Sequence, residues 1–204
     1  GKQYLADQYI KIYNNSDSVL YADGLVILES AFKTSQKYDY TPDIMSRAMA
    51  VQCVYAIPGN GKDYPVQPGK SLLICDKAID HREANSNSFD LSNADFEWFD
   101  DNDKNPDIDN PQVTNLDKIY SYTKTTWSLH NQGLCAYAIA RLQVDKNTFL
   151  TDYTYKATYI NVIGESQDKN AYQVPNAWII DAVNISNKAQ YAWNVVDASL
   201  DMGF

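Results

Sequence analysis

The sequence predicts an all-β fold, an antiparallel sandwich or barrel with long loop insertions and one short helix. Three observations predict it: short segments of alternating apolar and polar residues, turns rich in Gly, Pro and Asn, and a high aromatic content with 16 Tyr, 4 Trp and 6 Phe. Alternation with a period of two is typical of half-buried strands, and aromatic residues favour pleated sheets. Strands do not alternate with helical segments, which argues against a parallel α/β sheet. We expect one domain over residues 1–204.

The first half of the chain contains four segments that we predict as strands. In the first of them Ile10 and Ile12 share one face, and the next residues, Asn14 and Asn15, tolerate a left-handed turn. The fourth segment is mostly apolar and follows a Pro-Gly turn, so it suits a central position in a sheet. In chain order the strands are 8–13, 25–28, 47–57 and 71–75, and an irregular excursion fills 30–46.

The second half is harder to divide, because polar stretches separate its apolar segments. Residues 134–142 fit a strand or a helix, and Gly133 in a β-rich context favours the strand. Apolar residues at mixed helical spacing predict the short helix in the tail, 188–202. We expect loops at 77–95 and 100–111. The segments predicted as extended are 96–99, 116–127, 151–163 and 177–185. We expect 116–127 to be partly exposed, and 151–163 lies within a stretch, 144–172, whose structure the pattern leaves ambiguous.

Composition excludes several functions. The net charge is −9, and the 17 basic residues are scattered rather than clustered. Nucleic acids and anionic membranes both require clustered Lys and Arg, so we predict neither as a partner. No segment approaches the length of a transmembrane helix. The hydrophobic fraction of 45% is enough for a sizeable core.

The three cysteines are Cys53, Cys75 and Cys135. They are far apart and form no CxxC pair, which argues against a zinc knuckle or a redox dithiol. Cys53 and Cys75 lie in apolar runs, so we interpret them as small core residues. Cysteine usage leaves both the redox state and the cellular compartment open.

Five segments resemble the lamin-tail domain, an immunoglobulin-like sandwich. The sequence is more similar to an uncharacterised family of Bacteroidetes lipoproteins whose C-terminal half is lamin-tail-like, in strings such as NNSDSVLYADG and FDLSNADFEWFD. Lys11 departs from the lamin-tail pattern, which usually has an acidic residue at this position. Long insertions, chiefly at 30–46 and 94–125, also separate the later matching segments more widely than in that pattern. The matching segments are YIKIYNNS (9–16), ADGLVI (22–27), VQPGKSLLIC (66–75), FDLSN (89–93) and WIIDAV (178–183).

This resemblance implies an exported protein of the cell envelope, anchored to the membrane only through a lipid whose signal lies outside this sequence. The chain begins with Gly1 rather than Met, so we expect a fragment of a longer protein. The resemblance implies no known ligand and no catalytic residue. Loop-based binding properties do not transfer, because the loops are where the insertions lie.

The loop at 100–111 is strongly acidic and carries the one candidate metal site; we call it the acidic loop. Oxygen-bearing side chains occur at every second residue, and Ca²⁺ takes six to eight hard oxygen ligands. The loop is not an EF-hand, because the positions that require Gly and Glu hold Pro106 and Gln112. The alternative is a solvated acidic loop. The candidate ligands are Asp101, Asp103, Asn105, Asp107 and Asp109.

Aromatic residues near this loop are candidates for ligand binding. Tyr120 and Tyr122 have the same parity and would project from one face of a strand, Trp127 follows in a polar run, and Trp98 borders the acidic loop. An exposed aromatic row of this kind stacks on sugar rings or packs against a protein partner. The alternative is that these side chains pack at the edge of the sandwich.

No pattern for catalysis is present. The sequence lacks GxSxG, GxGxxG, HExxH and P-loop motifs, and its two histidines are His81 and His130. We interpret His81 as part of a surface turn. Opposite parity places His130 and Cys135 on opposite faces of a strand, so they do not form a catalytic pair.

We therefore predict a non-catalytic adhesion or ligand-binding module of the cell envelope, whose partner is a surface glycan or an envelope protein. No cofactor is expected apart from Ca²⁺ at the acidic loop. Two alternatives stay open. One is a structural spacer, which predicts no cleft and no exposed aromatic patch. The other is a hydrolase with a loop-built site acting on polysaccharide, which predicts a deep pocket with a carboxylate pair or a polarised His130.

Overall fold

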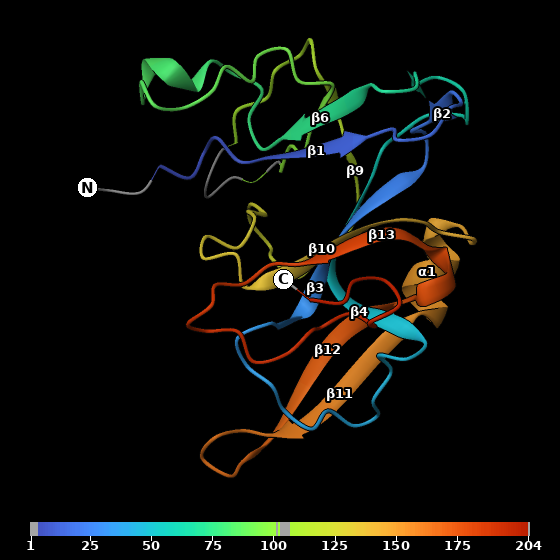
Figure 1. Ribbon diagram of the computed structural model, residues 1–204, viewed down its shortest axis with the longest axis vertical. Helices are drawn as coiled ribbons and strands as arrows, with labels where there is room; N and C mark the ends of the chain where they lie inside the picture. The colour runs from blue at the N-terminus through green and yellow to red at the C-terminus, as the bar shows by residue number, and fades with distance from the viewer. Residues whose placement is uncertain (1–3, 101, 103–106, 204) are drawn as a thin grey trace. The chain divides into compact units, whose positions relative to one another are not determined.

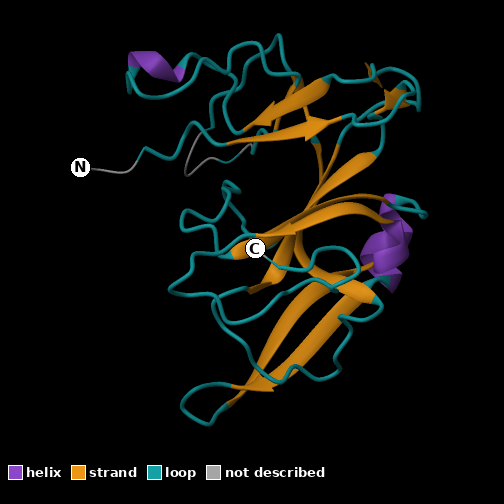
Figure 2. Ribbon diagram, in the orientation of Figure 1, coloured by secondary structure: helices purple, strands orange, loops and turns teal. Residues whose placement is uncertain are grey.

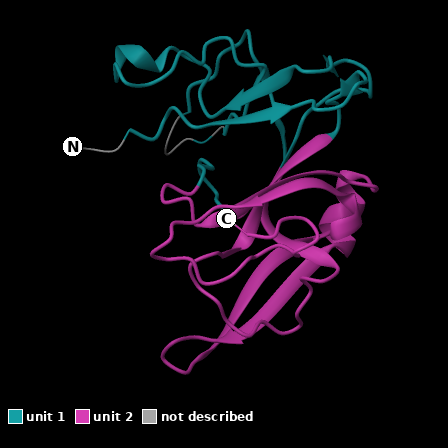
Figure 3. Ribbon diagram, in the orientation of Figure 1, with its two compact units in different colours: residues 1–24, 55–118, 123–129 teal, residues 25–54, 119–122, 130–204 magenta. Residues whose placement is uncertain are grey.

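The computed structural model describes residues 4–100, 102 and 107–203. Most of its regular structure is β-strand, which confirms the predicted all-β class (Figure 2). Contacts divide the chain into two compact units (Figure 3). Unit 1 comprises Gly1–Gly24, Tyr55–Lys118 and Thr123–Leu129, and unit 2 comprises Leu25–Val54, Ile119–Tyr122 and His130–Phe204. The assignment of one domain to the whole chain stays a prediction.

A seven-stranded sheet forms the framework of unit 2, and two of its strands, β4 and β9, continue into unit 1. Its order is β11-β12-β4-β3-β10-β13, and β9 pairs with β4 (Figure 1). Strands β3 and β4 are buried along almost their whole length, because both of their faces are covered. The strands are β3 (Leu25–Lys33), β4 (Ala48–Ala56), β9 (Asp117–Ser121), β10 (Cys135–Arg141), β11 (Thr154–Ile160), β12 (Ser166–Pro175) and β13 (Ile179–Asn184).

Strand β3 is longer than the predicted 25–28, because its polar residues are accommodated inside the sheet. Glu29 is 2% exposed and accepts hydrogen bonds from Gln52 Nε2 at 2.7 Å and from the Tyr137 hydroxyl at 3.1 Å. Ser30 donates to the Phe32 carbonyl. A buried polar side chain is tolerated when it is hydrogen-bonded, so the strand continues to Lys33 and the irregular excursion begins one residue later.

Unit 1 contains a four-stranded sheet and a two-stranded one. The four-stranded order is β1-β6-β7-β8, so the apolar strand β6 is central, as predicted. Strands β1 and β6 pair antiparallel with Ile10 opposite Ile74, whereas the two-residue pairings of β7 with β6 and β8 are parallel. The strands are β1 (Tyr9–Tyr13), β6 (Ser71–Cys75), β7 (Phe96–Glu97) and β8 (Thr114–Asn115), together with the pair β2 (Leu20–Tyr21) and β5 (Pro65–Val66).

The α-helix lies outside the predicted place. Helix α1 spans Lys146–Asp152, and its N-cap Asp145 accepts hydrogen bonds from the Asn147 and Thr148 backbone N–H groups. The prediction of a helix at 188–202 is wrong, because the described tail consists of turns and irregular segments. Tertiary bonds replace helical ones there: Val195 N–H donates to the Asn184 side chain at 2.8 Å. Two 3-10 turns, η1 (His81–Glu83) and η2 (Asn176–Trp178), complete the described helical structure.

All three cysteines are free and buried, which confirms Cys53 and Cys75 as core residues. The strand predicted at 134–142 is confirmed as β10. Among the described residues, no helix combines the length and apolar character that a membrane crossing requires.

Candidate functional site

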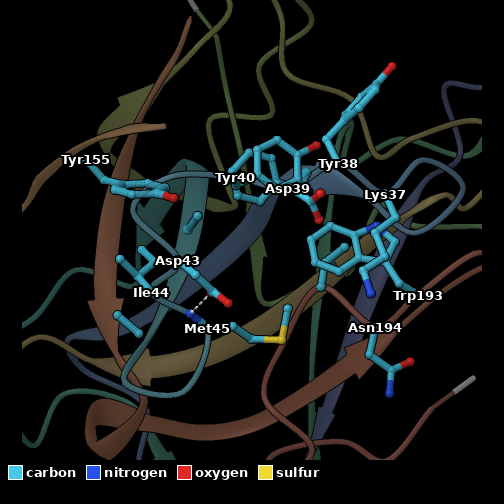
Figure 4. A pocket seen from close by; sticks show the side chains of 14 residues that line it. Lys37, Tyr38, Asp39, Tyr40, Asp43, Ile44, Met45, Tyr155, Trp193 and Asn194 are labelled. Atoms are coloured by element: carbon cyan, nitrogen blue, oxygen red, sulfur yellow. Dashed lines mark hydrogen bonds between the residues drawn. The ribbon is translucent and has the colours of Figure 1, made fainter. Parts of the chain in front are cut away.

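A pocket of about 580 Å³ lies in unit 2, and five aromatic side chains contribute to its lining (Figure 4). Figure 4 shows Asp43 and Ile44 below Tyr155, and Tyr38, Tyr40 and Trp193 grouped on the other side of the view. The aromatic lining residues are Phe32, Tyr38, Tyr40, Tyr155 and Trp193, and the charged ones are Lys37, Asp39 and Asp43.

The loop that follows β3 carries half of the lining residues and is fixed to an edge strand. Strand β11 has a partner on one side in the sheet, so its other side is free to bind the loop. Thr41 N–H donates to the Thr158 carbonyl, and Thr158 N–H donates back to the Thr41 carbonyl, both at 2.9 Å. The Tyr155 hydroxyl donates to the Pro42 carbonyl at 2.7 Å. These bonds hold Tyr38, Tyr40 and Asp43 against β11.

The C-terminal tail supplies Trp193. The backbone N–H groups of Ala192 and Trp193 both donate to the Thr34 carbonyl, at 2.9 Å and 3.2 Å. The indole Nε1–H donates to the carbonyls of Lys33 and Gln36, at 2.9 Å and 3.0 Å. Because its only donor is occupied, the indole offers a ligand its ring surface rather than a hydrogen bond.

The rings pack on one another before any ligand binds. Tyr40 stacks on Phe32 with 3.8 Å between ring centroids and on Trp193 with 5.8 Å. Tyr159 also contacts this group, with its ring centroid 4.7 Å from that of Tyr38 and 5.2 Å from that of Tyr40. Side chains that are already ordered lose little conformational entropy on binding, so the pocket is preorganised for a planar or ring-shaped ligand.

The polar groups of the pocket have unused hydrogen-bonding capacity. Burial, followed by the nearby Tyr159 and Tyr38 hydroxyls, raises the pKa of Tyr40, so this phenol stays protonated and able to donate at physiological pH. Asp43 accepts one hydrogen bond, from Met45 N–H at 2.9 Å. Within the described part of the chain, Lys37, Asp39 and Asp43 take part in no ion pair. The pocket thus combines an apolar wall with two available carboxylates.

Comparison with known proteins places the chain in a family. Residues 67–204 match the family model described as a protein of unknown function, DUF4876. The chain belongs to the DUF4876 family. A similar solved structure is the crystal structure of a DUF4876 family protein from Bacteroides thetaiotaomicron VPI-5482, with a TM-score of 0.77 and 23% sequence identity. The match covers 100% of this chain but 54% of that one, and at this identity it shows the fold alone. A search of curated proteins gave no match.

The link to Bacteroidetes that the resemblance implied is supported by this DUF4876 neighbour. Its finer content, a lipoprotein with a lamin-tail-like domain, stays a prediction.

Two of the predicted ligand-binding residues of this DUF4876 chain are core residues instead. Trp98 and Trp127 are 0% exposed, and Trp127 stacks on Tyr55 with 4.7 Å between centroids. Trp127 N–H donates to the carboxylate of Asp100 at 2.6 Å, and Trp98 Nε1–H donates to the Trp127 carbonyl at 3.2 Å. The prediction that Trp98 and Trp127 belong to an exposed row is wrong, because the buried Asp100 draws this segment of polar sequence into the core of unit 1.

The other two predicted residues lie in unit 2. Tyr120 is half-buried and packs on Tyr172 with 4.4 Å between centroids. Tyr122 is 51% exposed, and the Lys169 ammonium lies 5.8 Å from its ring centroid. Neither residue lines the aromatic pocket. A ligand-binding role for Tyr120 and Tyr122 stays a prediction.

The predicted Ca²⁺ ligands are only partly described. Asp101, Asp103 and Asn105 lie outside the described residues. The Asp107 carboxylate is buried and lies 3.1 Å from the Lys77 ammonium, while Asp109 is exposed and accepts a hydrogen bond from Asn115. Among residues 4–100, 102 and 107–203, no three His, Cys, Asp or Glu side chains are grouped to hold a metal ion. The Ca²⁺ site stays a prediction.

The two histidines hold structure together. His81 lies in the predicted turn but is 0% exposed rather than on the surface. A carbonyl oxygen only accepts hydrogen bonds, so His81 Nε2–H donates to the Lys77 carbonyl at 2.9 Å. In the neutral ring the other nitrogen, Nδ1, then accepts from the Tyr4 hydroxyl at 2.9 Å. His130 Nδ1 accepts from Gln132 N–H at 3.3 Å and from Leu134 N–H at 3.4 Å.

Cys135, five residues after His130 in the sequence, is unsuited to nucleophilic chemistry. Burial raises the pKa of Cys135 to about 12. The thiolate, rather than the thiol, is the nucleophile, so this group is inert near neutral pH.

Sequence reasoning missed the pocket. Most of its residues fall in the segment treated as an irregular excursion and in the tail treated as a helix. A local signal did exist at Tyr38 and Tyr40, two aromatic residues of the same parity in a polar loop. Nothing in the local pattern of Trp193 links it to that loop, because the link is made by backbone carbonyls about 160 residues away.

Proposed function

We propose that this chain is a non-catalytic carbohydrate-binding module and that the aromatic pocket of unit 2 is its binding site. The observation that carries the proposal is the combination of preordered Tyr and Trp rings with available carboxylates in one concave site. Ligand sites are typically apolar hollows in which a few polar groups fix the orientation of the ligand.

Sugar rings fit this combination for two reasons. Their C–H faces are apolar and pack against aromatic rings, which Tyr38, Tyr40 and Trp193 provide. Their hydroxyls donate hydrogen bonds, and the carboxylates of Asp39 and Asp43 are acceptors with free capacity, while the Tyr40 hydroxyl is a donor.

The pocket argues against a purely structural role, because a spacer needs neither a cavity nor available polar groups. It also supports binding over hydrolysis. Asp39 and Asp43 are both exposed, whereas the general acid of a glycosidase is typically held in a desolvated, apolar environment. Measured turnover of a polysaccharide would contradict the non-catalytic part of the proposal.

We also propose that the module is displayed on the cell envelope through a lipid anchor outside this sequence. The resemblance to Bacteroidetes lipoproteins supports this location. Fractionation of the parent organism's cells tests it: antibody against this chain should detect the protein in the membrane fraction, and recovery only in the soluble cytoplasm would contradict it.

The first test of binding is a glycan array followed by calorimetry with the best ligand. Trp193→Ala should weaken affinity by at least about tenfold, because a central aromatic anchor is lost. Tyr38→Ala, at a half-buried ring on the loop, provides a second variant in case the first one perturbs the tail. Circular dichroism melts report whether each variant is folded.

Two further variants serve as a control and as a test of the alternative site. Tyr13→Ala removes a ring that is 59% exposed in unit 1 and should leave affinity unchanged. Tyr122→Ala tests the aromatic row predicted from sequence. An unchanged affinity in folded Trp193→Ala and Tyr38→Ala, with a loss in Tyr122→Ala, would transfer the site to that row and contradict the pocket.

A further inference from the structure

The charge of the aromatic pocket bears on which sugars it accepts. Two carboxylates, Asp39 and Asp43, line it together with one ammonium, Lys37, so its formal charge is −1. The next cation along the chain, Arg47, donates to Gln173 Oε1 at 2.9 Å rather than pairing with Asp43. The whole chain carries a net charge of −9, which adds to the negative potential.

The aromatic wall, like the carboxylates, favours a positively charged ligand. A cation over the face of a Trp or Tyr ring is attracted by the ring quadrupole, and the attraction grows when the cation is desolvated. Trp193, Tyr40 and Tyr38 provide such rings beside the two carboxylates (Figure 4). The Tyr40 ring stays neutral, because burial and neighbouring hydroxyls raise the pKa of its phenol.

We propose that the pocket selects sugars that carry a protonated amine over their N-acetylated and acidic counterparts. This inference rests on the proposed function, since it names the ligand class of the same site. A hexosamine ring offers the apolar face that stacks on the aromatic wall, and its ammonium group offers three donors to the carboxylates of Asp39 and Asp43. N-acetylation removes the charge, and a uronic acid brings a carboxylate close to two others, which is repulsive.

Calorimetry with three oligosaccharides of equal length tests the inference: one of glucosamine, one of N-acetylglucosamine and one of glucuronate. The titrations are run at about pH 5.5, where the sugar amine is protonated. We expect the glucosamine oligomer to bind about tenfold more tightly than the N-acetylated one and the glucuronate oligomer to bind most weakly. Raising the salt concentration should reduce the glucosamine preference, because exposed charges are screened.

Matched variants separate a site effect from the general acidity of the chain. Asp39→Asn together with Asp43→Asn should reduce the glucosamine preference to about threefold or less. Asp152→Asn together with Asp181→Asn removes the same charge from exposed positions of unit 2 that do not line the pocket, and should leave the preference unchanged. Lys37→Ala should increase the preference, because it removes the one opposing charge of the lining.

The possible failures are distinguishable. Equal affinity for the glucosamine and N-acetylglucosamine oligomers, with loss of both in Trp193→Ala, would overturn the amine preference and retain a sugar site. A preference that persists in the Asp39→Asn, Asp43→Asn variant, or that disappears equally in the Asp152→Asn, Asp181→Asn control, would also overturn it. If no oligomer binds and the glycan array is blank with folded protein, the proposed function itself fails.

Discussion

The buried carboxyl of Asp76 in unit 1 is expected to make the stability of the chain depend on pH. Asp76 is 4% exposed, and its Oδ1 has no hydrogen-bond partner. Burial and then the nearby Asp107 raise its pKa to about 7, although Lys77 partly opposes this. The ionised form is therefore disfavoured in the folded protein relative to the unfolded chain, where an Asp has a pKa of about 3.9.

The sign of the effect on stability follows from proton linkage. Below about pH 4 Asp76 is protonated in both states and contributes nothing. Between about pH 4 and pH 7 the folded state retains a proton that the unfolded state has lost, so the free energy of unfolding falls as pH rises. Above about pH 7 the cost is constant.

Asp76→Asn removes this titration. We expect the stability of the variant relative to the wild type to rise by roughly 4 kcal/mol between about pH 4 and pH 8. Urea unfolding of both proteins at several pH values gives the difference directly. A stability difference that does not vary with pH would contradict the assignment, and Asp152→Asn, at an exposed position, is the control.

At the scale of elements, most of the longer strands were predictable, whereas strand β12 and the helix were not. The strand at β4 was found because apolar residues alternate over nine positions, and β6 because an apolar segment follows a Pro-Gly turn. Helix α1 has an amphipathic pattern of only seven residues, too short to stand out. Its stability comes from packing, as expected for a helix of this length.

The packing of α1 depends on one side chain. Phe149 is 0% exposed and stacks on Tyr172 of β12 with 5.4 Å between centroids and on Tyr153 with 5.7 Å. Phe149→Ala should lower the free energy of unfolding by about 3–5 kcal/mol, because it opens a cavity under the helix. Asn147→Ala, at an exposed position of the same helix, should have little effect. If the two variants unfold at the same urea concentration, α1 does not dock in this way.

At the scale of the whole chain, the candidate site depends on contacts that local patterns do not encode. The loop after β3 is held by β11, and Trp193 is held by Lys33 and Gln36, so residues from three distant segments meet. Sequence periodicity reports which face of an element is buried, and it carries no information about which loop a tail will contact. The burial of Trp127 was missed for the same reason, because Asp100 lies 27 residues away.

For the whole chain, the family and the fold class are known, whereas the binding function is a proposal. Membership of the DUF4876 family and the all-β class are established. The binding function rests on the aromatic pocket, since the family description names no activity.

The most direct test of the pocket is an NMR titration that follows the indole N–H signals of the four tryptophans. Trp193→Phe assigns the Trp193 signal by its loss. Adding the best oligosaccharide from the glycan array should shift the Trp193 signal in proportion to saturation, while the signals of the buried Trp98 and Trp127 stay in place. Saturable sugar binding that leaves the Trp193 signal unmoved would contradict the account.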